Sequence, residues 1–144
     1  MKKPPELSPL FQDSHFQKYP FVEIPQSFKD ERGLIANISD GNLGDVAVIT
    51  SRTGSIRANH YHAQDWHLSY LVIGSMIYNW KAINGQDEGE IEIKAGDLFY
   101  TPMMIAHKMR FITDSVFVAV SKLNRNQENY ESDTHRLNND FFQK

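Results

Sequence analysis

Histidines are the residues whose type and spacing most directly indicate chemistry in this 144-residue chain. Three of them fall within the short segment from His60 to His67, which reads His-Tyr-His-Ala-Gln-Asp-Trp-His. On a β-strand, side chains two positions apart point to the same face, so His60 and His62 share a direction. A tight turn after His62 would bring His67 back beside them, and His107 begins a later strand-like run that could complete the set. Converging imidazoles of this kind bind transition-metal ions.

These histidines could instead be structural residues of the core. A lone histidine on an apolar face is more often a hydrogen-bonded core residue than a ligand, so a single H-x-H pair is weak support. Three histidines in so short a segment, on predicted strands, favour the metal. The chain contains no cysteine, which leaves nitrogen and oxygen as the available ligand atoms. Asp65 could orient one of the imidazoles by accepting its ring N–H.

Short β-strands are the elements that must position these histidines. Runs rich in valine, isoleucine and aromatic residues alternate with glycine, asparagine and aspartate. The predicted strands are Phe21–Ile24, Gly33–Ile38, Asp45–Thr50, Ser55–His62, His67–Ile73, Ser75–Ile83, Gly89–Lys94, Asp97–Thr101, His107–Ile112 and Ser115–Leu123. Many short strands without a long helical pattern predict an all-β sandwich or barrel.

The length fits one domain with flanking segments. We interpret residues 1–20 as an N-terminal tail or arm able to pack on a neighbour, and residues 21–124 as the β-barrel domain. Residues 125–144 form a polar segment with room for one or two helical turns and little to bury. We assign no role to the two flanking histidines, His15 and His135. The polar residues after the last strand look like an ordinary solvated face; they are Lys122, Asn124, Arg125 and Asn126.

The composition limits the classes of partner that the protein is expected to bind. The formal net charge is −3, which gives no reason to expect binding to nucleic acid or to an anionic membrane surface. No apolar run approaches the roughly 20 residues of a membrane-spanning helix, and the N-terminus lacks the apolar run of a signal peptide. We therefore expect a soluble, cytoplasmic protein that binds a small molecule.

The spacing of glycine, histidine and proline resembles the two conserved motifs of the cupin superfamily, G-x5-H-x-H-x3-4-E-x6-G and G-x5-P-x-G-x2-H-x3-N. The matching residues are Gly54, His60, His62, Gly74, Gly96, Pro102 and His107. His67 stands where the family usually has glutamate, Met104 replaces a glycine, and Phe111 replaces an asparagine. The resemblance implies a double-stranded β-helix, the cupin jelly-roll barrel. It implies His60, His62, His107 and, with less support, His67 as metal ligands, an all-neutral set for Zn, Fe, Ni, Cu or Mn.

A narrower resemblance points to the RmlC-like cupins of bacterial polysaccharide biosynthesis. The sequence Arg57-x-x-His60-Tyr61-His62 resembles 3,4-ketoisomerases of dTDP-sugars and the cupin domain of capsular polysaccharide reductases. Residues 28–33, Phe-Lys-Asp-Glu-Arg-Gly, resemble the opening of ketoisomerases and of dTDP-4-dehydrorhamnose 3,5-epimerases. The resemblance implies an isomerase or epimerase of a small sugar or nucleotide-sugar carbonyl compound. In that family the histidines generally act as acid and base without metal, so the two interpretations compete for His60 and His62.

Such a reaction needs a base near neutral pH and a group that stabilises the enediolate oxygen. Histidine suits the first task, whereas a metal, arginine or tyrosine suits the second. Arg57 and Tyr70 are the catalytic candidates, and Arg57 could instead bind a phosphate or carboxylate. The candidate substrate contacts are Arg57, Tyr78, Trp80, Met109 and Phe111, although Tyr78 and Trp80 also fit an ordinary core stripe.

Two other functions remain open. All-neutral histidine ligands on a cupin barrel also suit a mononuclear Fe, Ni or Cu dioxygenase. The third possibility is a non-catalytic cupin that binds a small molecule as a sensor. Such sensor domains are usually attached to a DNA-binding module, and the sequence shows no helix-turn-helix pattern. Cupins of this size commonly pair through edge strands, so we expect a homodimer with the N-terminal arm reaching across.

Overall fold

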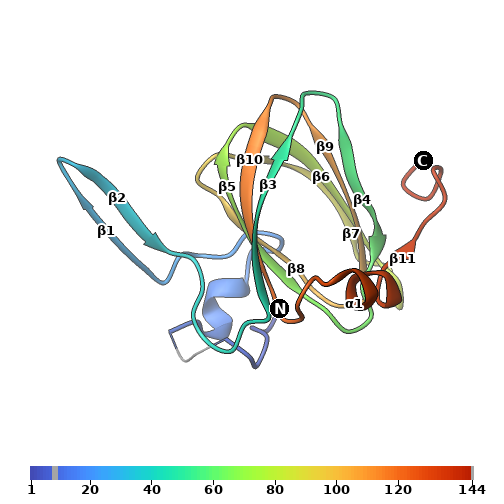
Figure 1. Cartoon of the computed structure of the whole chain (residues 1–144), viewed down its shortest axis with the longest axis horizontal. Helices are drawn as coiled ribbons and strands as arrows, with labels where there is room; N and C mark the ends of the chain where they lie inside the picture. The colour runs from blue at the N-terminus through green and yellow to red at the C-terminus, as the bar shows by residue number, and fades with distance from the viewer. Residues whose placement is uncertain (8–9, 144) are drawn as a thin grey trace.

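The protein is almost entirely β-structure in the computed structural model, which describes residues 1–7 and 10–143 (Figure 1). Within these residues the strands are β1 (Gln26–Asp30), β2 (Gly33–Asn37), β3 (Asp45–Ser51), β4 (Ile56–Tyr61), β5 (His67–Ile73), β6 (Ser75–Ala82), β7 (Glu88–Lys94), β8 (Leu98–Thr101), β9 (Ile105–Phe111), β10 (Ser115–Ser121) and β11 (His135–Arg136). A 3-10 turn, η1 (Asp13–Phe16), and a short helix, α1 (Gln127–Ser132), complete the set. In this part of the chain no helix is long and apolar enough to cross a membrane.

Two antiparallel sheets face each other and form the barrel (Figure 1). One sheet has the strand order β3-β10-β5-β8, and the other has the order β11-β4-β9-β6-β7. Most hydrogen-bonded neighbours are therefore not consecutive in sequence, which is the connectivity of a double-sheet jelly roll. This architecture confirms the predicted all-β jelly-roll barrel.

Alternate side chains of the strands fill the space between the sheets. Leu71, Met76, Tyr78 and Phe99 are fully buried there. The same alternation on β5 turns His67 inward with Leu71. The histidine segment is therefore continuous with the core.

The N-terminal segment packs on its own barrel. Phe11 and Phe16 are buried in a second apolar cluster, together with Trp66 and Tyr100. This cluster also contains Leu68 of β5, whose side chain points to the opposite face from His67. The segment thus covers the outer face of the sheet, behind the histidines.

The predicted strand Phe21–Ile24 is wrong. Phe21 makes isolated bridges, one of them to Phe99, and the first strand is β1. Proline lies on both sides of this stretch, at Pro20 and Pro25. Because proline has no backbone N–H, it interrupts the ladder of hydrogen bonds that a full strand requires.

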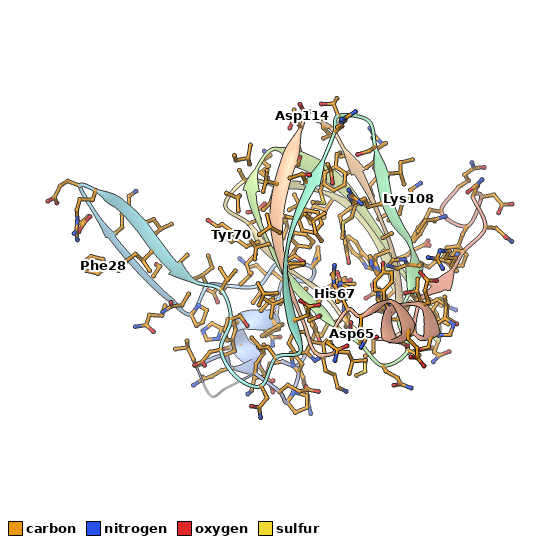
Figure 2. The ribbon with its side chains drawn as sticks, viewed as in Figure 1. Phe28, Asp65, His67, Tyr70, Lys108 and Asp114 are labelled. Carbon is orange, nitrogen blue, oxygen red and sulfur yellow. The ribbon has the colours of Figure 1, made fainter. Side chains whose placement is uncertain are left out.

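Strands β1 and β2 form a hairpin that projects away from the barrel (Figure 1). Phe28 lies on this hairpin and points into solvent (Figure 2), with 59% of its surface exposed. Leu34 and Ile35 on β2 are 53% and 65% exposed. The hairpin therefore presents apolar side chains that nothing within the described residues covers.

The C-terminal segment closes one end of the barrel. Its strand β11 pairs with β4 through His135↔Tyr61 and Arg136↔His60. Asp133 and Thr134, just before β11, are buried. The prediction that this segment has little to bury is wrong at these two positions.

Candidate active site

A β-bulge in β4 directs His60 into the barrel. Arg57 pairs with Met109 and His60 pairs with His107, while Asn59 is the extra residue between them. Ala58 and Asn59 have φ angles of 67° and 59°, in the left-handed region that side chains other than glycine rarely adopt. A regular strand would turn Arg57 and His60 to opposite faces because they are three residues apart. The bulge lets both line the same cavity.

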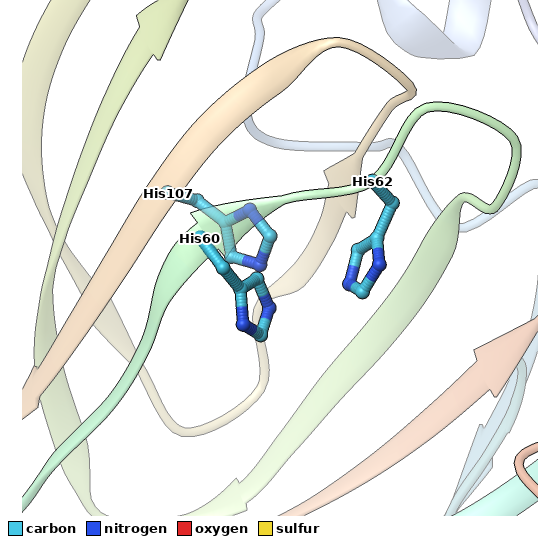
Figure 3. Close-up of side chains that lie close together, drawn as sticks. All are labelled: His60, His62 and His107. Atoms are coloured by element: carbon cyan, nitrogen blue, oxygen red, sulfur yellow. The ribbon is translucent and has the colours of Figure 1, made fainter. Parts of the chain in front are cut away.

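Three imidazoles meet in the barrel interior (Figure 3). One ring nitrogen from each of His60, His62 and His107 lies within 4.8 Å of the other two, and all three residues are buried. The Nδ1 of His62 donates to the carbonyl oxygen of Asp133 at 3.0 Å, and the Nδ1 of His107 donates to that of Ile105 at 3.3 Å. Since a carbonyl can only accept, both rings carry their proton on Nδ1. The Nε2 of His62 is buried without a hydrogen-bond partner within the described residues.

Burial keeps these imidazoles neutral. Desolvation, together with the charges of neighbouring histidines, lowers the pKa of His60 to about 3 and that of His62 to about 4. The pKa of His107 is lowered well below its ordinary value for the same two reasons. Near neutral pH the three rings therefore offer lone pairs and not positive charges.

His67 is held in a different way. Its Nδ1 accepts from the guanidinium of Arg125 at 3.2 Å, and its Nε2 donates to Oδ2 of Asp65 at 3.1 Å. Asp65 and His67 lie close together near α1 (Figure 2). Both ring nitrogens of His67 are thus occupied, whereas His60, His62 and His107 form the group that could hold a metal among the described residues. The suggestion that Asp65 orients an imidazole agrees with this contact.

Asp133 fixes the loop between β4 and β5. Its carboxylate accepts the backbone N–H groups of Ala63, Gln64 and Asp65 at 2.9–3.2 Å. Its backbone oxygen also accepts the proton of His62. One residue of the C-terminal segment therefore positions both ends of the histidine loop.

His60, His67 and His107 line a cavity of about 410 Å³ between the two sheets. Its other lining residues are Ile49, Ile56, Arg57, Ala58, Ser69, Met109, Phe117, Arg125 and Tyr130. Arg57 is held at the wall because its guanidinium donates to Ser51 Oγ at 2.7 Å and to the carbonyl oxygen of Thr50 at 2.8 Å. The cavity therefore combines neutral imidazoles with two guanidinium groups.

Most of the remaining predicted site residues lie outside this cavity. Tyr70 is on the face of β5 that packs against the N-terminal cluster, away from His67 and Ser69. Tyr78 and Phe111 are fully buried in the core, where Tyr78 stacks on His107 at 6.3 Å between ring centroids. Trp80 packs on Tyr19 at 5.3 Å. None of Tyr70, Tyr78, Trp80 and Phe111 is among the residues that line the cavity, whereas Met109 is.

Sequence reasoning missed Arg125, Tyr130 and Asp133. The interpretation of Arg125 as part of a solvated face is wrong, because its side chain lines the cavity and bonds to His67. The three residues lie beyond the last predicted strand, in a polar segment without periodicity. Arg125 follows β10, whose Ser121 pairs with His67, whereas Asp133 lies just before β11, which pairs with β4 beside His60.

The role of Asp133 can be tested by stability measurements. Asp133→Ala leaves the three N–H groups of the loop without their acceptor, so we expect the free energy of unfolding to fall by about 3 kcal/mol. Asp140→Ala, at an exposed position of the same segment, should change it by less than about 0.5 kcal/mol. Urea denaturation measures both. Equal, small effects of the two substitutions would contradict the anchoring role.

The comparisons with known proteins concern the fold. No protein-family model matches the sequence, and no curated protein does. The sugar 3,4-ketoisomerase QdtA from Thermoanaerobacterium thermosaccharolyticum, solved in complex with TDP, matches with a TM-score of 0.64 and 20% identity over 81% of this chain and 85% of that chain. A dTDP-4-dehydrorhamnose 3,5-epimerase from Sulfolobus tokodaii matches with a TM-score of 0.61 and 16% identity over 72% and 69% of the two chains.

A third match is the capsular polysaccharide assembling protein CapF from Staphylococcus aureus, with a TM-score of 0.59 and 20% identity. The match covers 78% of this chain but 34% of CapF, so the present chain spans about a third of that protein. At these low identities the agreement is one of architecture. The chain has the jelly-roll fold of the RmlC-like cupins.

Proposed function

We propose that the protein is an isomerase or epimerase that moves a proton at a carbon next to the carbonyl group of a sugar or nucleotide-linked sugar. One observation carries the proposal: a single cavity combines neutral imidazoles, a histidine–aspartate pair and two guanidinium groups. The fold it shares with a 3,4-ketoisomerase and a 3,5-epimerase supports the same reaction class. Fold alone does not fix a reaction, so the argument depends on the site.

In this proposal His67 is the base. Asp65 holds the Nε2 proton, which leaves the lone pair of Nδ1 as the position that accepts a proton. The C–H bond next to the carbonyl breaks, the proton moves to Nδ1, and the electron pair passes to the carbonyl oxygen to give an enediolate. Isomerisation follows when the hydroxyl proton of the enediolate moves to the former carbonyl oxygen, the other oxygen becomes the new carbonyl, and the proton on Nδ1 returns to the former carbonyl carbon. Return of the proton to the opposite face of the original carbon gives epimerisation. Arg125 moves away from Nδ1 when the substrate enters, which frees this nitrogen to accept the proton.

The group of His60, His62 and His107 fits a divalent transition ion, whether Zn, Fe, Ni, Cu or Mn. Protons do not compete for nitrogens whose pKa is so low, and the unpartnered Nε2 of His62 is a lone pair without a use inside the protein. When bound, such an ion would polarise the substrate carbonyl as a Lewis acid. In the proposal these three residues are ligands and His67 is not.

Arg57 binds the anionic part of the substrate in this proposal. Its contacts to Ser51 and Thr50 fix the guanidinium at the cavity wall, where it can present paired N–H donors to phosphate oxygens. The solved complex of QdtA contains TDP, which is consistent with a nucleoside diphosphate as the anion. Met109 provides an apolar contact, and Tyr70 has no role because it lies on the other face of β5.

The metal part of the proposal predicts a measurable stoichiometry. Wild-type protein purified without chelator should contain close to one equivalent of transition metal by elemental mass spectrometry. His60→Ala and His62→Ala should each remove most of it, whereas His15→Ala in the N-terminal segment should not. Wild-type protein without metal, before and after reconstitution, would contradict the metal site.

The reaction predicts exchange of a substrate proton with solvent. A dTDP-linked 4-keto sugar incubated in heavy water should gain deuterium next to the carbonyl, as measured by NMR. His67→Asn should slow the exchange by about 100-fold or more because it removes the base, and His15→Asn should leave it unchanged. Oxygen uptake coupled to substrate loss, without deuterium exchange, would instead identify a dioxygenase.

We also propose that two copies of the chain pair through the projecting hairpin. Phe28 and Ile35 expose apolar surface on it, and Val46 and Val48 are 61% and 69% exposed on β3. β3 is an edge strand, and the two-stranded hairpin has free edges as well. Adding the hairpin of one copy to β3 of the other would cover both edges and both apolar faces.

The pairing can be tested by sedimentation velocity at micromolar concentration. Wild-type protein should sediment as a dimer, and the double variant Phe28→Glu, Ile35→Glu should sediment as a folded monomer. Met103→Glu, which places a charge at another exposed apolar position, serves as the control and should remain dimeric. A monomeric wild type would refute the pairing.

A further inference from the structure

We propose that Arg125 recognises a carboxylate on the reacting part of the substrate, so that the substrate is a sugar acid and not a neutral sugar. This inference rests on the proposed function and names its substrate class. It assigns to the cavity a second anion-binding position, separate from the one at Arg57.

The guanidinium of Arg125 has no counter-charge within the described part of the chain. Its one hydrogen-bond partner there is Nδ1 of His67, which is not a carboxylate, and its Nε is buried without a partner. No carboxylate of these residues lies within ion-pair distance of it, whereas Arg32 is paired with Asp30 and Arg136 with Glu131. A partly buried cation without a counter-ion is costly, so its position in a cavity points to an anion that arrives with the ligand.

The carboxylates nearest to the site are already in use. Asp65 accepts from His67 with one oxygen and from the backbone N–H of Leu123 with the other. Asp133 is bonded to the three N–H groups of the histidine loop. Asp45 accepts the backbone N–H of Arg125, not its guanidinium. The neutral imidazoles add no negative charge, and a bound divalent ion would make the cavity more positive still.

The two arginines are anchored at opposite ends of β3. The backbone N–H of Arg125 is bonded to Asp45 at the start of β3, and the side chain of Arg57 is bonded to Ser51 at its end. The guanidinium of Arg125 contacts His67, whereas that of Arg57 is held by Ser51 and Thr50. We therefore assign them to two anionic groups of one ligand, a phosphate at Arg57 and a second group beside the reacting carbons at Arg125.

A carboxylate fits the inner position. The guanidinium presents N–H donors in a planar fork that matches two carboxylate oxygens, and such charge-assisted bonds are strong. A hydroxyl group of a neutral sugar would leave the positive charge uncompensated. Arg125 is therefore the residue that discriminates between the two kinds of substrate.

The test compares UDP-glucuronate with UDP-glucose, which differ by a carboxylate in place of a hydroxymethyl group. Isothermal titration calorimetry should show that wild-type protein binds the uronate at least about 10-fold more tightly. Arg125→Gln should abolish the preference while leaving the affinity for UDP-glucose close to that of wild type. Arg57→Gln should weaken both ligands by similar factors, and Arg110→Gln, at an exposed position on β9, should change neither. Arg125→Lys, which keeps the charge without the fork, should retain part of the preference.

Equal binding of the two ligands by wild type, or a preference that survives in Arg125→Gln, overturns the inference while leaving the nucleotide-sugar function in place. If neither nucleotide sugar binds, the nucleotide part of the proposed function fails, and free glucuronate against free glucose then decides the inference. A preference for free glucuronate that depends on Arg125 supports it, and equal or absent binding of the two overturns it. Thermal unfolding of each variant checks that the substitutions leave the fold intact.

Discussion

Burial of several imidazoles in one cavity is the constraint on which the rest of the site depends. Each protonated ring would raise the cost of protonating the next, and desolvation opposes the charge on each of them. The rings of His60, His62 and His107 are therefore neutral, and a buried neutral ring needs a partner for its N–H group. The backbone oxygens of Asp133 and Ile105 supply these partners to His62 and His107, and Asp65 bonds to the neighbouring His67. Their positions decide which nitrogen lone pairs point into the cavity.

The C-terminal segment makes that arrangement possible. It contributes Arg125 and Tyr130 to the cavity wall and Asp133 to the histidine loop. It also holds the bulge of β4 in place, because Asn59 and Leu137 exchange hydrogen bonds of 3.1 and 3.3 Å. The left-handed backbone at Ala58 and Asn59 is strained, and such strain persists where the surroundings hold it. A jelly roll without this segment would keep its core but lose the geometry of the site.

Much of the fold could be predicted from the sequence, because alternation and turn residues are local signals. The all-β architecture and the common direction of His60 and His62 could be predicted from such signals. Tyr70 could also have been placed correctly, since it has opposite parity to His67 on the same strand. The bulge in β4 could not be predicted, because nothing in Ala58 or Asn59 requires a left-handed conformation. Arg125 and Asp133 reach the site through the tertiary pairings of β10 with β5 and of β11 with β4, and no local pattern encodes these contacts.

Nitrogen NMR of the histidine side chains is the most direct test of the account. In 15N-labelled, metal-free protein titrated from pH 8 to pH 5, the rings of His60, His62 and His107 should remain neutral throughout. His62 and His107 should carry their proton on Nδ1. Protonation of any of the first three rings between pH 6 and pH 7 would contradict the account, because the cavity would then contain positive imidazoles, which can neither bind a metal ion nor act as lone-pair donors.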